Sequence, residues 1–178
     1  MKTASKSRKR LDFLDLIQGV LTHDDIYETI DYRRQSEDKI KQFIYPHLIE
    51  NLTTHLVETK ELDKTTAKER VKEALKWEGN VKTTVNNILF MGTQNRPDMV
   101  LEMNGLRIAI EFKRGSKGSE LRSGIGQSMI YATHYDFVIY LFIDTTEDKR
   151  IQNSVDSVNE SEFIEELWNR YNIKFIVA

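Results

Sequence analysis

Three charged residues in the second half of the chain have the types and spacing that metal-assisted chemistry needs. They are Asp98, Glu111 and Lys113. Carboxylate oxygens bind Mg²⁺, which keeps several waters and leaves coordination positions open for phosphate. A bound divalent cation polarises a phosphoryl oxygen and lowers the pKa of a bound water, and a neighbouring lysine orients that water or offsets charge developing on the phosphate. Together the three residues could hydrolyse a phosphate ester.

The pattern around these residues predicts a β-hairpin that brings them together. Asn104-Gly105 is a strong signal for a tight turn, and apolar and polar residues alternate on both sides of it. Asp98 and Glu111 lie at similar distances from the turn, so antiparallel pairing places them level. Residues two apart on a strand point to the same face, so Glu111 and Lys113 project together. The simpler alternative is a strand whose charges face solvent.

The motif residues resemble those of a known superfamily. Pro97-Asp98 followed by Glu111-Phe112-Lys113 resembles the PD-(D/E)XK nucleases of the restriction-endonuclease-like fold. Gln127 and Tyr131, which share one face of a predicted helix, are similar to the glutamine-x3-tyrosine helix of the RecB-like branch. The resemblance covers about the last half of the chain. It implies an α/β fold with a mixed central sheet flanked by helices, here with a helix-rich N-terminal part.

The resemblance also implies a role for each motif residue. Asp98 and Glu111 would hold Mg²⁺, with Mn²⁺ able to substitute, and Lys113 would orient water and offset transition-state charge. Gln127 would assist positioning, while Tyr131 would shape the pocket or contact the backbone. The alternative for the last two is a hydrogen-bonded pair on the helix surface, or a tyrosine packed on the sheet.

A third carboxylate comes from a predicted helix in the first half of the chain. Glu37 shares a helical stripe with three apolar residues, so it faces the core or a site rather than open water. The first helix of the resembled fold commonly contributes a glutamate, which makes Glu37 the expected third metal ligand, with Asp38 and Asp31 as alternatives. Glu37 could instead be a first-turn acid behind a Ser36 cap. The apolar residues of the stripe are Ile40, Ile44 and Leu48.

A basic loop follows the Glu-x-Lys motif. Arg114, Lys117 and Arg122 accompany Lys113 there, with Glu120 as the one acid. Such a cluster suits contact with a phosphate backbone, although it could also be a solvated connection. The net charge of −2 does not argue against a nuclease, because the metal supplies positive charge locally.

Composition and patterning set the wider expectations. The chain has 178 residues, no cysteine and no apolar run of membrane-spanning length. The N-terminal basic residues are not followed by an apolar stretch, so no secretory signal is expected. We expect an intracellular, cytoplasmic protein with a flexible basic tail at 1–10 and one domain at 11–178. That domain would be mostly helical over 11–80 and would carry the catalytic core over 81–178.

Periodicity predicts the individual elements. Pro46 is expected to kink or break the long second helix unless it opens a new one. Gly124 and Gly126 would let a backbone or ligand approach the Gln127 helix closely. Helices are predicted at 11–19, 22–59, 65–77, 119–135 and 161–171, and strands at 83–90, on both sides of the 104–105 turn, at 136–144 and at 173–177.

The sequence therefore predicts a Mg²⁺-dependent nuclease that cleaves DNA. The chain has no Gly-x4-Gly-Lys-Ser/Thr phosphate loop, so a helicase or ATPase motor would be a separate partner. A homodimer is the other expected assembly. One alternative is a catalytically silent nucleic-acid-binding or assembly module on the same fold. Another is a protein-interaction module in which the motif is coincidental. Endonuclease against exonuclease action, DNA against RNA, strandedness and specificity all stay open.

Overall fold

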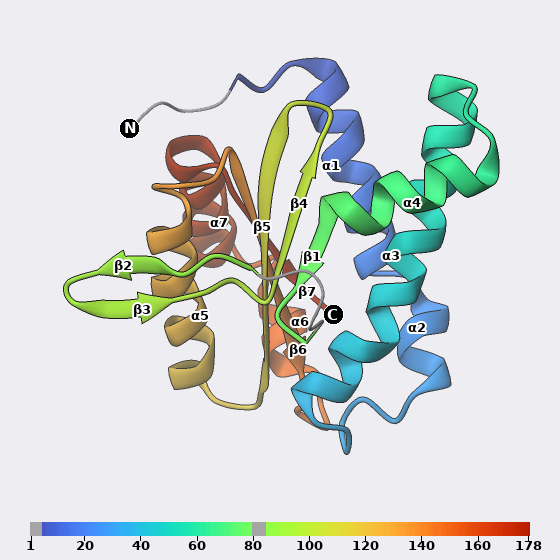
Figure 1. The fold of residues 1–178 in the computed structure, drawn as a ribbon. Helices are drawn as coiled ribbons and strands as arrows, with labels where there is room; N and C mark the ends of the chain where they lie inside the picture. The colour runs from blue at the N-terminus through green and yellow to red at the C-terminus, as the bar shows by residue number, and fades with distance from the viewer. Residues whose placement is uncertain (1–4, 80–84) are drawn as a thin grey trace. The chain divides into compact units, whose positions relative to one another are not determined.

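The computed structural model describes residues 5–79 and 85–178 (Figure 1). They form two compact units, residues 5–76 and residues 77–178, which we describe one at a time. The boundary lies close to the predicted change from the helical part to the second part of the chain. No helix in the described ranges combines the length and the apolar character needed to cross a bilayer.

The first unit is helical. Helix α3 packs against both α1 and α4, and the buried side chains of α3 include one at every fourth position from Ile40 to Leu56. Helix α1 takes in the last three residues of the segment expected to be a tail. Thr22 ends α1 rather than capping the next helix, because its hydroxyl donates to the carbonyl of Gln18. The helices are α1 (Arg8–Leu21), α2 (Asp24–Thr29), α3 (Glu37–Lys60) and α4 (Lys64–Ala74).

Helix α3 runs unbroken through Pro46, so the predicted break there is wrong. An interior proline costs about 3 kcal/mol through its lost N–H bond and its clash one turn back. Ile44 and Leu48, one on each side of it, are fully buried, and burying each such side chain contributes roughly 1.5–3 kcal/mol. One continuous apolar stripe therefore offsets the cost of the proline. The break falls instead at 30–36, where Ser36 caps α3 by accepting the Lys39 N–H at 3.3 Å.

The second unit is built on a five-stranded sheet of order β1-β4-β5-β6-β7. Strands β4 and β5 are antiparallel, and β5, β6 and β7 are parallel, so the predicted mixed sheet of an α/β fold is confirmed. Helix α5 packs on β5 and β6, and α7 packs on β7. The strands are β1 (Leu75–Trp77), β4 (Met99–Met103), β5 (Leu106–Gly115), β6 (Phe137–Asp144) and β7 (Ile173–Val177); the helices are α5 (Gly118–Tyr131), α6 (Arg150–Ser154) and α7 (Val158–Tyr171).

The β4–β5 hairpin forms as predicted. Asn104 and Gly105 both have positive φ angles, 56° and 72°, as a tight two-residue hairpin turn requires. The strands pair Met99 with Ile110. Asp98 precedes Met99 and Glu111 follows Ile110, so the two carboxylates lie level across the hairpin.

Helix α5 approaches the sheet closely at one glycine. A Cβ atom added to Gly124 would lie 2.3 Å from the Tyr140 ring on β6. The hydroxyl of Tyr140 donates to the carbonyl of Leu121 at 3.0 Å, which ties the two elements together. The predicted close approach therefore occurs at Gly124, whereas a Cβ on Gly126 would meet nothing within 4 Å.

The expected first core strand at 83–90 is wrong in its described part; residues 83 and 84 lie outside the described residues. Strand β2 (Ile88–Phe90) pairs with β3 (Thr93–Asn95) in a separate two-stranded sheet. The apolar run suggested burial, but Leu89 and Phe90 are exposed. Strand β1, directly after α4, is the edge strand beside β4 instead.

Candidate functional site

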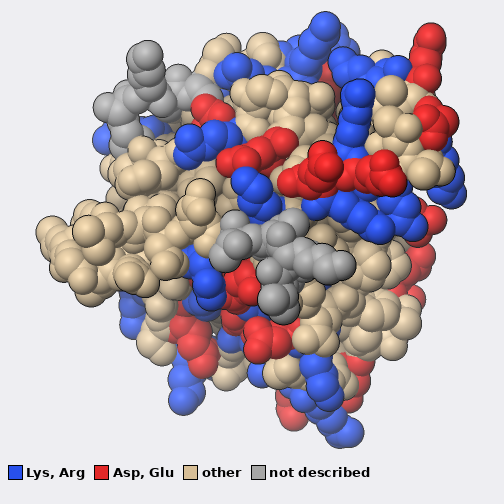
Figure 2. Space-filling model, viewed as in Figure 1, with Lys and Arg blue, Asp and Glu red and all other residues tan. Residues whose placement is uncertain are grey.

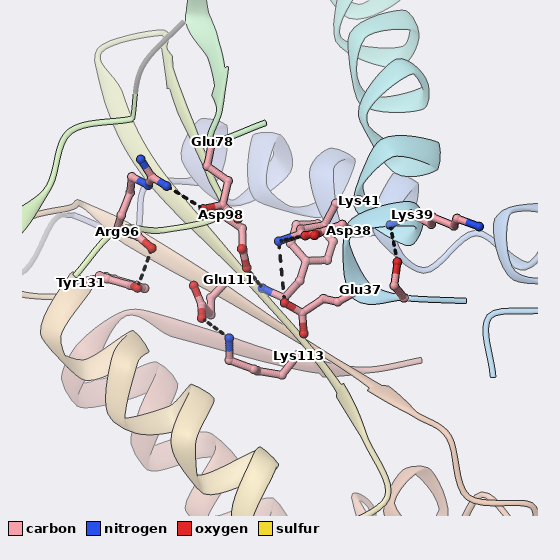
Figure 3. A network of polar contacts seen from close by, with 12 residues as sticks. Glu37, Asp38, Lys39, Lys41, Glu78, Arg96, Asp98, Glu111, Lys113 and Tyr131 are labelled. Atoms are coloured by element: carbon pink, nitrogen blue, oxygen red, sulfur yellow. Dashed lines mark hydrogen bonds and ion pairs between the residues drawn. The ribbon is translucent and has the colours of Figure 1, made fainter. Parts of the chain in front are cut away.

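Glu111 and Lys113 project from the same face of β5, as the strand period predicts. Glu111 is 1% exposed, and its Oε1 lies 2.9 Å from the Nζ of Lys113 (Figure 3). Phe112 lies between them in sequence, points to the opposite face and is fully buried. A buried carboxylate is thus paired with a lysine whose side chain keeps 22% of its surface exposed.

Asp98 joins this pair from the neighbouring chain segment. Its Oδ2 accepts the backbone N–H of Phe112 at 2.7 Å, and its own carbonyl accepts the N–H of Glu78 at 3.1 Å. The residue is 6% exposed. The side chain of Asp98 therefore reaches the peptide that links Glu111 to Phe112, and a buried carboxylate directly before β4 lies beside one on β5.

Tyr131 brings a phenol from α5 to the same place. It is fully buried, and its hydroxyl donates to the carbonyl of Arg96 at 2.9 Å. Burial raises the pKa of Tyr131, and the negative charges of Glu111 and Asp98 raise it further. The phenol is thus neutral over the physiological range and lies beside both carboxylates.

Gln127 lies one helical turn before Tyr131 on α5. The side-chain oxygen of Gln127 is buried and has no hydrogen-bond partner among the described residues. A buried amide oxygen without a partner carries a desolvation cost of about 1–3 kcal/mol. The helix thus carries both residues of the predicted pair at its C-terminal end, which the Gly124 contact fixes against the sheet.

Two further residues of this region were missed by the sequence analysis. Arg96 and Glu78 form an ion pair, with 3.1 Å between Nη2 and Oε2. The Arg96 carbonyl holds Tyr131, so this arginine connects the phenol to the Pro97-Asp98 turn. The position of Arg96 directly before that motif was an available signal. Glu78 is distant in sequence and gave no signal.

The charges around Tyr131 suit a divalent cation. The carboxylates of Glu111, Asp98 and Glu78 all raise its pKa. Lys113 forms an ion pair with Glu111, and Arg96 forms one with Glu78. Buried carboxylates are costly without compensating positive charge, and carboxylate oxygens are the ligands that Mg²⁺ prefers. The donor set therefore fits the predicted metal. Over residues 5–79 and 85–178, no group of three or more His, Cys, Asp or Glu side chains is arranged to hold a metal ion.

Glu37 lies in the first turn of α3, in the helical unit. Its side chain is 27% exposed and lies 3.7 Å from the Nζ of Lys41, which also pairs with Asp38 at 3.1 Å. Lys41 itself is 2% exposed, an unusual burial for a lysine that the sequence analysis missed. The Ser36 cap of the simpler interpretation is present. The assignment of Glu37 to the metal site stays a prediction.

The basic loop leads into α5 through a defined cap. The Glu120 carboxylate accepts the backbone N–H groups of Ser116 at 3.0 Å and Lys117 at 2.9 Å. Arg150 donates to the Ser116 carbonyl at 2.9 Å. Of the predicted phosphate-contacting residues, Lys117 and Arg122 are exposed at the start of α5 and Arg114 is half-buried on β5.

No protein-family model matches the chain, and comparisons with curated proteins and with solved structures found no match either.

Proposed function

We propose that the protein is a metal-dependent nuclease that hydrolyses phosphodiester bonds in DNA, on a restriction-endonuclease-like fold. One observation carries the proposal. Asp98, directly before β4, and Glu111, on β5, are buried and level with each other, with Lys113 on the same face as Glu111. This is the arrangement expected for a Mg²⁺ site that acts on phosphate.

Asp98 and Glu111 would hold the metal, with Glu37 as a third ligand. When bound, Mg²⁺ or Mn²⁺ supplies Lewis-acid chemistry and a lowered pKa of bound water. With few carboxylate ligands, the remaining coordination positions go to water and substrate. Lys113 would orient the attacking water and offset the charge that develops on the phosphate.

The two α5 residues would position the reacting groups. Tyr131, neutral and hydrogen-bonded to the Arg96 carbonyl, would keep the turn that carries Asp98 in place. Gln127, one helical turn before Tyr131, would place its buried side-chain oxygen beside the reacting groups. Lys117 and Arg122 would contact phosphates, which fixes register on the duplex but reads no sequence.

The test is a cleavage assay with purified protein. Single-stranded, linear duplex, supercoiled and branched DNA, and RNA, are each incubated with Mg²⁺, Mn²⁺ or EDTA. Lys113→Gln is compared with Lys149→Gln, which removes an exposed lysine after β6. We expect metal-dependent cleavage that falls by about 10²–10³-fold in Lys113→Gln, because a transition-state contact is lost. Lys149→Gln should cleave as the wild type does.

Each other outcome has a definite meaning. Cleavage by Lys113→Gln at the wild-type rate would show that the assignment of this lysine is wrong. DNA binding without cleavage on any substrate would favour a silent binding or assembly module. Neither binding nor cleavage would reject the proposal.

A further inference from the structure

The β2–β3 hairpin presents an apolar tip to solvent. Leu89 is 71% exposed, Phe90 43% and Met91 88%. Ile88, at the base, is 5% exposed and belongs to the core cluster that includes Tyr131. The hairpin, drawn in light green in Figure 1, is thus anchored in the second unit at its base. Its β2 side and its turn carry large exposed apolar side chains.

The turn at the tip has Met91 at a position where methionine does not favour folding. Met91 and Gly92 have positive φ angles of 47° and 76°. The first position of such a turn favours Asn, Asp or Gly, and a side chain such as Met is disfavoured in this conformation. An exposed apolar residue therefore occupies a position where a polar residue would make the hairpin more stable. This is typical of a side chain that serves contact rather than folding.

The composition of the hairpin suits the bases of a nucleic acid. The sequence has no charged residue from Val85 to Asn95 and no acidic residue between Glu78 and Asp98. Figure 2 shows the hairpin as a tan protrusion without Lys, Arg, Asp or Glu. Amide side chains read base edges in the grooves, and apolar side chains wedge between base steps. The amide residues of this segment are Asn86, Asn87, Gln94 and Asn95.

The hairpin is joined directly to the candidate site. Strand β3 ends at Asn95, and Arg96 and Pro97 alone separate it from Asp98. Arg96 is fixed at its carbonyl by Tyr131 and at its guanidinium by Glu78. Each strand has three residues, which extend about 10 Å. The grooves of B-DNA are about 7.5–8.5 Å deep, so the tip can reach the floor of a groove.

We infer that the β2–β3 hairpin enters a groove of duplex DNA, and that Leu89 and Met91 wedge against a base step beside the cleavage site. The inference rests on the proposed function, because the hairpin is placed relative to the Asp98–Glu111 site. On this inference, the substrate is duplex DNA, and the protein binds it with one base step opened.

The test uses the full chain with the double substitution Leu89→Ser and Met91→Asn. Asparagine suits the positive φ at position 91, so the turn should keep or gain stability while the apolar surface is lost. The matched control is Val158→Ser, which removes an apolar side chain of similar exposure, 73%, on α7. Both sets of substitutions are made in wild type and in Lys113→Gln, and thermal melting confirms that each variant is folded.

Binding is measured in the Lys113→Gln background, on short duplexes that carry 2-aminopurine and on single strands. We expect duplex binding to raise the fluorescence of 2-aminopurine as its base unstacks. The double variant should lose this rise and bind duplex about tenfold more weakly, because it lacks the apolar side chains that would wedge at the base step. Its binding to single strands should change less, and Val158→Ser should behave as its parent does.

The inference and the proposed function fail in different ways. If the double variant unstacks and binds duplex as its parent does, the inference is overturned, while Lys113-dependent cleavage leaves the proposed function in place. Hairpin-dependent unstacking without any cleavage would support the inference and count against the nuclease. A change from dimer to monomer in sedimentation, with unchanged DNA binding, would show that the tip contacts a second copy of the chain and would overturn the inference.

Discussion

The sheet holds two buried carboxylates with opposite surroundings. Asp144, at the end of β6, and Glu111, on β5, are both 1% exposed. Asp144 accepts four hydrogen bonds from residues just downstream: from the N–H and hydroxyl of Thr146 at 2.9 and 2.7 Å, and from the N–H groups of Ile151 and Gln152 at 2.9 and 3.0 Å. Glu111 faces Lys113 and lies near the Tyr131 phenol.

This contrast separates a structural carboxylate from the one that we propose to be reactive. Burial by itself would raise the pKa of Asp144, but the hydrogen bonds from Thr146, Gln152 and Ile151 lower it below its ordinary value. Its charge is satisfied by local donors, and it fixes the start of α6. Glu111 lies near Asp98 and is paired with one lysine, so its surroundings concentrate negative charge. The partners of a buried carboxylate therefore indicate its role better than its burial does.

The largest effect is expected from Glu111→Gln. Cleavage should fall by about 10³-fold, because a ligand of the catalytic metal is lost. Stability should change little, since Gln keeps the side-chain volume and Lys113 keeps part of its surface in solvent after its partner is neutralised. Single-turnover cleavage and urea unfolding measure the two effects. Glu102→Gln, an exposed acid on β4 of the same hairpin, serves as the control. A loss of stability without a loss of cleavage would make Glu111 a structural residue like Asp144.

Asp144→Ala should have the opposite signature. Losing the four hydrogen bonds to the carboxylate is expected to lower the free energy of unfolding by about 3 kcal/mol. The cleavage rate per folded molecule should not change. Urea unfolding gives the stability, and cleavage is measured where the variant is still folded. A folded but inactive Asp144→Ala would break the contrast between the two carboxylates.

Glu37 and Asp38 test whether the helical unit contributes a ligand. Both are first-turn acids of α3 that pair with Lys41. If Glu37 holds metal, Glu37→Gln should slow cleavage by about 10²-fold and raise the Mg²⁺ concentration needed, as expected for a lost metal ligand. Asp38→Asn should have little effect. Equal effects of the two substitutions would show that both acids act only through the negative charge at the start of α3, and that Glu37 is not a metal ligand.

Tyr131→Phe should have a smaller effect on both properties. The variant loses the hydrogen bond to the Arg96 carbonyl, worth about 1 kcal/mol, and cleavage should slow about tenfold as the Asp98 turn loosens. Because the phenol pKa is raised, the pH–rate profile of the wild type should show no tyrosine titration below pH about 10. A titration near pH 8 that disappears in Tyr131→Phe would contradict this position beside two carboxylates.

The smallest effect is the pH dependence of stability that Asp144 causes. Its folded pKa lies below the unfolded value, so its contribution is present above about pH 4 and is lost as pH falls through the folded pKa. The wild type should therefore lose more stability between pH 5 and pH about 3 than Asp144→Asn does. Urea unfolding at the two pH values measures the difference. Parallel losses in both proteins would show that the Asp144 cap is not formed in solution.

The sequence predicted what local pattern determines. The Asn104-Gly105 turn and the strand period together place Asp98, Glu111 and Lys113, and no distant contact is needed to infer them. Strand β7 and the common face of Gln127 and Tyr131 follow in the same way from short-range periodicity.

What the sequence did not predict depends on distant partners. Arg96 and Glu78 meet only because the sheet forms, and the continuity of α3 through Pro46 depends on burial along its whole length. The β2 run looked like a core strand because its apolar residues were assumed to be covered. Asp144 was predicted as part of a strand, although Thr146 two residues later could have indicated a cap.

The contact between Gly124 and Tyr140 has a consequence for how this sequence can change. Alanine in a helix is favoured over glycine by about 1 kcal/mol, so mutation toward a more stable α5 is always available at position 124. Any such change pushes α5 away from β6, and Gln127 and Tyr131 move with it. Helix stability and cleavage would then be in opposition at a single residue. The packing against Tyr140 and, on the proposed function, the position of Gln127 and Tyr131 would both keep glycine there.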